Sequence, residues 1–158
     1  MRFSEEQKKI YEIVLEAHKQ ASAEIKPGNP WNKAHNTAIK VITEGLINLG
    51  ILKGNPDDLI ERGEYLKFYM HRIGHWLGMD VHDVGNYKKN GKWRNLEPGM
   101  VLTVEPGIYI LDTLEDVEEK WLGIGIRIED DLLVTGSGNE VITANAPREI
   151  QDIENLKS

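Results

Sequence analysis

The residues best suited to chemistry in this sequence are histidines and glutamates that lie in separate segments. His71, His75 and His82 fall close together, whereas Glu105 and Glu129 each follow a strongly apolar run. A neutral imidazole and two carboxylates form a suitable ligand set for a divalent metal, and an oxygen-rich set favours harder ions. We therefore predict a metal site made of His75, Glu105 and Glu129, for Mn, with Co and Zn as alternatives.

Simpler interpretations of the same histidines remain open. His71 and His75 have the i, i+4 spacing of a helical zinc pair, but that motif needs a glutamate where this sequence has Arg72. Gly74 and Gly78 instead favour a loop that lets the backbone approach a site closely. Each histidine could equally be a partly buried, hydrogen-bonded ring without a metal.

The alternation of side chains along a strand places further polar groups beside the glutamates. In the segment 124–129 the isoleucines share one face, and Arg127 and Glu129 share the other. Thr103 and Glu105 point together in the same way. The alternative is that these are exposed charges at a sheet edge, or a surface pair between Arg127 and Glu129.

Two other groups of residues have weaker functional interpretations. His18 and His35 lie in predicted helices without companions, so we assign them structural roles. A basic polar insert also contains aromatic residues, which suits either a binding loop or a solvated one. It comprises Tyr87, Lys88, Lys89, Lys92, Trp93 and Arg94.

Three helices are predicted before residue 65. Ser4 and Gln7 form a capping box ahead of apolar residues at helical spacing, which indicates a helix over 4–25. The same periodicity predicts a second helix over 31–49, and a cap followed by proline predicts a third over 56–62.

The second half of the chain alternates short apolar runs with glycine, proline and asparagine, which is typical of strands and turns. Strands are predicted over 100–105, 108–110, 124–135 and 141–144, with a hairpin loop at 136–139. Helices followed by antiparallel strands indicate one α+β domain spanning residues 1–158.

Composition excludes several classes of function. The 158 residues include no cysteine, which rules out disulfides, thiolate metal sites and a cysteine nucleophile, and fits the reducing cytoplasm. A formal net charge of −7 makes nucleic acid an unfavourable partner. No apolar run is long enough to span a membrane, so a membrane partner is not expected.

The stretches that contain the candidate residues resemble proline-specific metallopeptidases of the pita-bread fold, in particular the C-terminal part of aminopeptidase P (Xaa-Pro aminopeptidase). The matching stretches are residues 68–78, 80–85, 96–107 and 123–131. The likeness extends to the opening residues 2–7 and the helix after them. The resemblance implies a partial pita-bread fold, with an antiparallel sheet backed by helices.

The resemblance also implies roles for individual residues. His75, Glu105 and Glu129 match metal ligands, and Glu105 also matches a residue that helps to activate the nucleophilic water. His71 and His82 match histidines that contact the substrate and stabilise the tetrahedral intermediate. Tyr109 and Arg127 match residues that line the pocket on the proline side. The implied substrate is a peptide with proline at its second position, and the implied reaction is hydrolysis of the Xaa-Pro bond.

Family members carry two further metal ligands, both aspartates, on a strand hairpin before the helix that begins here at Ser4. The resemblance therefore implies that this chain starts after them and binds at most one ion. Two functions remain open: a metallopeptidase that is inactive alone, or a binding or structural module without catalysis. The strands 102–104 and 124–128 are expected to expose apolar faces or unpaired edges, which favours self-association as a homodimer.

Overall fold

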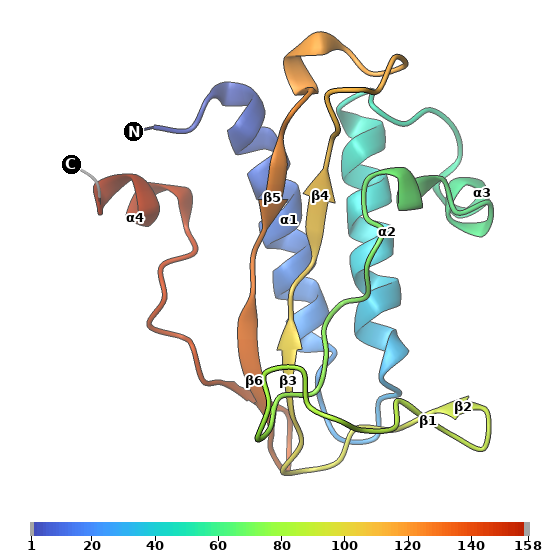
Figure 1. Cartoon of the computed structure of the whole chain (residues 1–158), viewed down its shortest axis with the longest axis vertical. Helices are drawn as coiled ribbons and strands as arrows, with labels where there is room; N and C mark the ends of the chain where they lie inside the picture. Colours follow the sequence, from blue (N-terminus) through green and yellow to red (C-terminus); the bar gives the residue numbers. More distant parts are fainter. Residues whose placement is uncertain (1, 157–158) are drawn as a thin grey trace.

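The computed structural model describes residues 2–156. A bent antiparallel ribbon of strands lies against two long helices, and shorter elements surround this pair of layers (Figure 1). The helices are α1 (Glu5–Ala23), α2 (Asn32–Asn48), α3 (Pro56–Glu61) and α4 (Ile150–Asn155). The strands are β1 (Lys88–Lys89), β2 (Lys92–Trp93), β3 (Val101–Val104), β4 (Gly107–Tyr109), β5 (Gly125–Arg127), β6 (Asp130–Val134) and β7 (Asn139–Val141). This arrangement confirms the predicted α+β class.

Helix α1 begins where its capping box predicts. The Ser4 hydroxyl accepts a hydrogen bond from the Gln7 amide, and the Gln7 side chain accepts one from the Ser4 amide at 2.9 Å. Helix α2 packs beside α1, and the two approach so closely that a Cβ at Gly45 would collide with Ile13. These two closely packed helices therefore form the layer on which the strands pack.

The strands β3–β6 and β4–β5 form one ribbon with a constant register. Val104 lies opposite Asp130, and Gly107 lies opposite Arg127. The residues between these pairs follow the same register, which places Glu105 opposite Glu129. The predicted continuous strand over 124–135 is therefore wrong, because it is interrupted at 128–129. Pro106 has no amide hydrogen to donate across the ladder at this point.

An irregular segment runs along the other edge of β3 and holds His75. The Thr103 amide donates to the His75 carbonyl at 2.9 Å, and the Glu105 amide donates to the Ile73 carbonyl at 2.7 Å. Gly74 makes this approach possible, because a Cβ at that position would overlap the Thr103 carbonyl oxygen. The close approach predicted for this glycine is therefore present, and it brings a histidine beside a strand.

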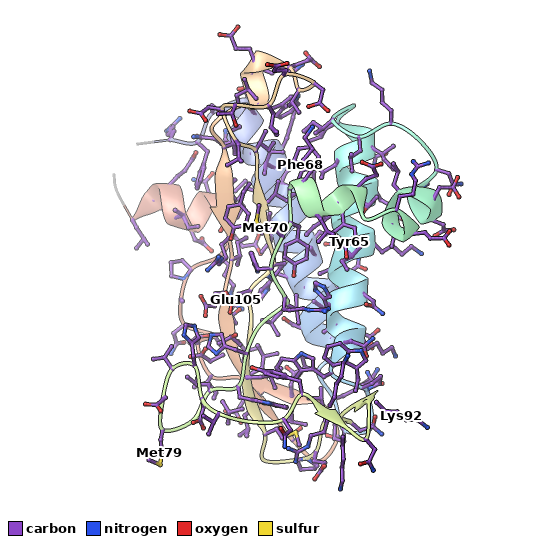
Figure 2. The ribbon with its side chains drawn as sticks, turned by 45° about the vertical axis from the view of Figure 1, so that its right-hand side comes forward. Tyr65, Phe68, Met70, Met79, Lys92 and Glu105 are labelled. Atoms are coloured by element: carbon purple, nitrogen blue, oxygen red, sulfur yellow. The ribbon has the colours of Figure 1, made fainter. Side chains whose placement is uncertain are left out.

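The apolar face of the ribbon is buried, contrary to the expectation that it would be exposed. Leu102, Val104, Ile124 and Ile128 all belong to the core that the ribbon shares with the helices. This side of the strands packs on α1, while the opposite side carries the charged residues. The exposed apolar side chains lie elsewhere, with Met79 at the tip of its loop (Figure 2).

Three further elements differ from the sequence predictions. The strand expected at 141–144 is instead β7, which ends at Val141, because the following residues turn and Thr143 bonds through its side chain. The basic insert forms the β1–β2 hairpin, whose turn residues Asn90 and Gly91 both have positive φ. Helix α4 was not predicted.

Among residues 2–156, no helix has both the length and the apolar character needed to cross a membrane.

Candidate metal and substrate site

The structure brings His75, Glu105 and Glu129 together on the charged side of the ribbon. One ligand atom from each residue lies within 4.8 Å of the other two. The two glutamates oppose each other where the ladder is interrupted, and the histidine comes from the segment beside β3. Figure 2 shows Glu105 midway along the ribbon, above the loop that carries Met79.

Hydrogen bonding fixes which nitrogen of His75 faces the glutamates. Its Nδ1 lies 2.9 Å from the Trp76 carbonyl, which can only accept, so Nδ1 carries a hydrogen. In the neutral ring Nε2 then has the free lone pair, and it lies 3.4 Å from Glu105 Oε1. Metal-binding histidines are commonly oriented in this way by a hydrogen bond from their other nitrogen.

Glu105 is held from two sides. The Thr103 hydroxyl donates to Glu105 Oε1 at 2.9 Å, and it accepts the His75 amide at 3.0 Å. Arg127 Nη1 lies 3.4 Å from the second oxygen, Oε2. Only 8 % of Glu105 is exposed, so this carboxylate is placed by the protein rather than by solvent.

Electrostatics in the cluster favour a bound cation. Partial burial raises the pKa of Glu129 above its ordinary value, and the negative charges of Glu105 and Asp131 raise it further, against the opposing effects of His75 and Arg127. Two carboxylates directly opposite each other repel, and the lone pair of His75 faces the same space. A divalent ion would relieve both effects, so this donor set fits one.

A hydrogen-bonded chain extends from Arg127, the ion-pair partner of Glu105, to His71. Arg127 Nε donates to the Tyr109 hydroxyl at 2.6 Å, and that hydroxyl lies 2.9 Å from His71 Nε2. His71 Nδ1 is 2.8 Å from the Arg72 carbonyl and therefore carries a hydrogen. In the neutral ring the Tyr109 hydroxyl consequently donates to Nε2. The direction of each hydrogen bond from Arg127 through Tyr109 to His71 is thus defined.

His82 also lies at this site, although it comes from an exposed loop. Its ring centre is 4.3 Å from that of His75, with the two rings nearly perpendicular. All seven residues predicted from the sequence therefore gather on one side of the ribbon. The predicted structural roles of His18 and His35 agree with their burial.

Sequence reasoning missed residues that support this site. Thr103 was placed on the same face as Glu105, but its two hydrogen bonds were not foreseen. Asp130 is 1 % exposed and pairs with Arg148, a contact that no sequence motif indicated. An acidic residue on the apolar face of a predicted strand was the available signal, because a buried charge needs a partner.

Comparison with known proteins places the chain in a family. The model of metallopeptidase family M24 matches residues 1–136. The chain belongs to metallopeptidase family M24. This chain is 56 % identical to the Xaa-Pro aminopeptidase of Haemophilus influenzae over 155 residues, which cover 98 % of the chain and 36 % of that relative.

Solved structures show the same fold as this M24 chain. Aminopeptidase PepP of Pseudomonas aeruginosa superposes with a TM-score of 0.96 at 57 % identity, covering 98 % of the chain and 35 % of that structure. Zinc-substituted Escherichia coli aminopeptidase P in complex with product gives 0.93 at 46 % identity, with the same coverage. The M24 chain thus has a partial pita-bread fold and spans about a third of its relatives' length.

Proposed function

We propose that this chain supplies metal-binding and substrate-contacting groups of an aminopeptidase that releases the residue before a proline. The main support for this proposal is that one ligand atom from each of His75, Glu105 and Glu129 lies within 4.8 Å of the other two. A connected series of polar side chains lies beside these atoms. The names of the similar proteins from H. influenzae and E. coli support the Xaa-Pro specificity.

The three converging residues would hold a divalent ion, which supplies Lewis-acid polarisation of the scissile carbonyl. His71 and His82 contact the substrate peptide and stabilise the tetrahedral intermediate. Tyr109 and Arg127 line the pocket for the proline side. Glu105 assists in activating the attacking water by accepting a proton.

We further propose that the ion is Mn²⁺ and that the chain alone binds one. Among residues 2–156, His75, Glu105 and Glu129 are the one group of three or more histidine or carboxylate side chains that could share an ion. Calorimetric titration with Mn²⁺ should therefore give a stoichiometry of one, and Glu129→Ala should abolish the binding. Glu140→Ala is the matched control, because this exposed glutamate lies on β7 outside the group.

Hydrolysis of an Xaa-Pro peptide with added Mn²⁺ tests the reaction itself. Release of the first residue that Glu129→Ala abolishes and Glu140→Ala preserves would support peptidase activity in the chain alone. Binding of one ion without hydrolysis is the result expected of a metallopeptidase that is inactive alone, and a binding module without catalysis would give the same result. Absence of Mn²⁺ binding would contradict the proposed site.

We also propose that the chain is located in the cytoplasm, because its sequence has no cysteine.

We further propose that the chain self-associates. Support for self-association comes from an exposed loop near the site, in which Met79, Val81 and Val84 are 100, 70 and 88 % exposed. Sedimentation velocity should show dimers whose population rises with concentration, and Val84→Asp should reduce it. A single monomeric boundary at high concentration would contradict the proposal.

A further inference from the structure

A buried ionic cluster lies directly behind Glu129. Asp130 follows Glu129 in the chain, points to the helix side of the ribbon and is 1 % exposed. Its carboxylate accepts a hydrogen bond from the Thr143 hydroxyl at 2.5 Å and pairs with Arg148. The Nε2 atom of His18 in α1 lies 3.2 Å from the same carboxylate.

The cluster holds the main chain as well as the side chain. The Thr143 hydroxyl also accepts the Asp131 amide at 3.0 Å, and the Ile142 amide donates to the Asp131 carbonyl at 2.8 Å. The backbone immediately after Glu129 is therefore attached to the segment that follows β7. Arg148 links this segment onward, because its carbonyl accepts the Tyr11 hydroxyl of α1 at 2.7 Å.

Glu129 needs such support more than Glu105 does. Thr103 and Arg127 orient the Glu105 carboxylate, whereas the Glu129 carboxylate makes no hydrogen bond or ion pair with any residue of 2–156. Glu129 also lies at the interruption between β5 and β6, where regular ladder bonds do not restrain it. Its position is consequently set by the backbone on either side.

We infer that Asp130, clamped by Thr143 and Arg148, is a positioning residue that holds Glu129 in the geometry needed to bind a metal ion. This inference rests on the proposed function, because it presumes that Glu129 is a ligand. The cluster lies on the helix side of the ribbon, opposite the face that carries Glu129, and none of its members belongs to the candidate ligand group. Groups that orient metal ligands typically change metal affinity by about 10- to 100-fold when they are removed.

Metal binding by the folded protein separates positioning from general stability. We would measure Mn²⁺ affinity by calorimetry and the visible absorption of bound Co²⁺, which reports coordination geometry. Asp130→Asn retains the size of the side chain but removes its charge. Thr143→Val removes both bonds of the hydroxyl and, because Thr143 is only half-buried, serves if Asp130→Asn does not fold.

Val134→Ala is the matched control. Val134 lies on the same face of β6 as Asp130 and is 1 % exposed, so its truncation loosens the same strand without touching the cluster. We expect Asp130→Asn and Thr143→Val to weaken Mn²⁺ binding about 10- to 100-fold and to alter the Co²⁺ spectrum. Val134→Ala should lower thermal stability and leave both metal readouts unchanged.

The outcomes distinguish the two proposals. If the wild-type chain binds no Mn²⁺, the proposed function fails and the inference falls with it. If the wild type binds Mn²⁺ and both cluster variants bind it equally well, the inference alone is overturned. An equal loss of affinity in Val134→Ala would also overturn it, because strand loosening in general would then be the cause.

Discussion

The Thr103 side chain connects two of the three candidate ligands. Its hydroxyl accepts the amide of His75 and donates to Glu105, and the residue is 2 % exposed. A hydroxyl in this position sets both the approach of the histidine and the direction of the carboxylate. Its removal would leave a buried amide and a buried carboxylate oxygen with one partner fewer.

Replacing Thr103 with valine should weaken both metal binding and folding. We expect Thr103→Val to lower Mn²⁺ affinity by about 10-fold or more, because Glu105 loses its orienting donor. Stability should fall by roughly 1–3 kcal/mol from the unsatisfied buried groups. Calorimetric titration and urea unfolding of the same preparation measure the two effects.

Thr43→Val provides the control for this substitution. Thr43 is fully buried in α2, and its hydroxyl has no hydrogen-bond partner among residues 2–156. The same chemical change should therefore leave metal affinity unchanged and should not destabilise the fold. Equal losses of affinity in the two variants would show that Thr103 has no special connection to the ligands.

His35 makes the fold sensitive to acid. Burial and, to a smaller extent, the nearby charges of Arg72 and His71 together lower the pKa of His35 to about 4. Because the folded pKa lies below the ordinary 6.5, the folded state resists protonation. Stability from the neutral ring is fully present above pH 6.5 and is lost as the pH falls towards 4. The loss from this group is about 3 kcal/mol.

His35→Gln should therefore reduce the pH dependence of unfolding. We expect the free energy of unfolding to fall less between pH 7 and pH 4.5 in this variant than in the wild type. Part of the dependence should remain, since burial also lowers the pKa of His18. Identical pH profiles for His35→Gln and the wild type would refute this role.

At the scale of elements, the edge of β3 depends on one glycine. Gly74 lets the segment before His75 lie against the strand, where any side chain would overlap the Thr103 carbonyl. Gly74→Ala should force the segment away from β3. We expect a loss of about 1–3 kcal/mol of stability from overpacking and a marked loss of Mn²⁺ affinity, because His75 moves with the segment.

Gly136→Ala tests whether this effect is specific to the site. A Cβ at Gly136 meets no atom within 4 Å, and its φ lies outside the left-handed region. This substitution should leave the free energy of unfolding unchanged or raise it by about 0.4–1 kcal/mol, because alanine restricts the unfolded chain more than glycine does. Thermal unfolding of the two variants side by side provides the measurement. A Gly74→Ala protein as stable as Gly136→Ala would contradict the tight contact.

The sequence predicts these elements well where the signal is local. The capping box of α1 and the helical periodicity of α2 depend on neighbouring residues, and both helices form within two residues of the predicted bounds. The β1–β2 hairpin was missed although Asn90 and Gly91 are its local signal, because the surrounding lysines suggested a solvated loop. The break at 128–129 was missed because Pro106 acts from the opposite strand.

The site illustrates the same limit. Strand alternation correctly predicts that Arg127 and Glu129 share a face, because the ribbon keeps its register across the interruption at 128–129. The opposition of Glu105 and Glu129 depends on the register between two strands, which no single segment contains. The cluster around Asp130 joins three distant segments, and only the folded chain brings them together.

For the whole molecule, a bound ion should act as a stabilising link. The candidate ligands come from the segment beside β3, from the residue after β3 and from the residue before β6. An ion that binds only the folded arrangement stabilises it by mass action, by about 2.7 kcal/mol at a hundredfold excess over the dissociation constant. Mn²⁺ should therefore raise the unfolding temperature of the wild type.

Calorimetric scans with and without Mn²⁺ check this linkage. Glu140→Ala should show the same rise as the wild type, whereas Glu129→Ala should show none. A rise of equal size in Glu129→Ala would locate the stabilising ion elsewhere on the protein.

A hydrogen bond joins the two ends of the described chain. The Phe3 amide donates to Glu154 Oε1 at 3.0 Å, and α4 lies near the start of α1 (Figure 1). A short peptide linker could therefore close the chain into a ring, and the ring could be reopened at the exposed turn between Asn90 and Gly91. In such a circular permutant both glutamates would precede His75 in the polypeptide, while their arrangement in space would be retained.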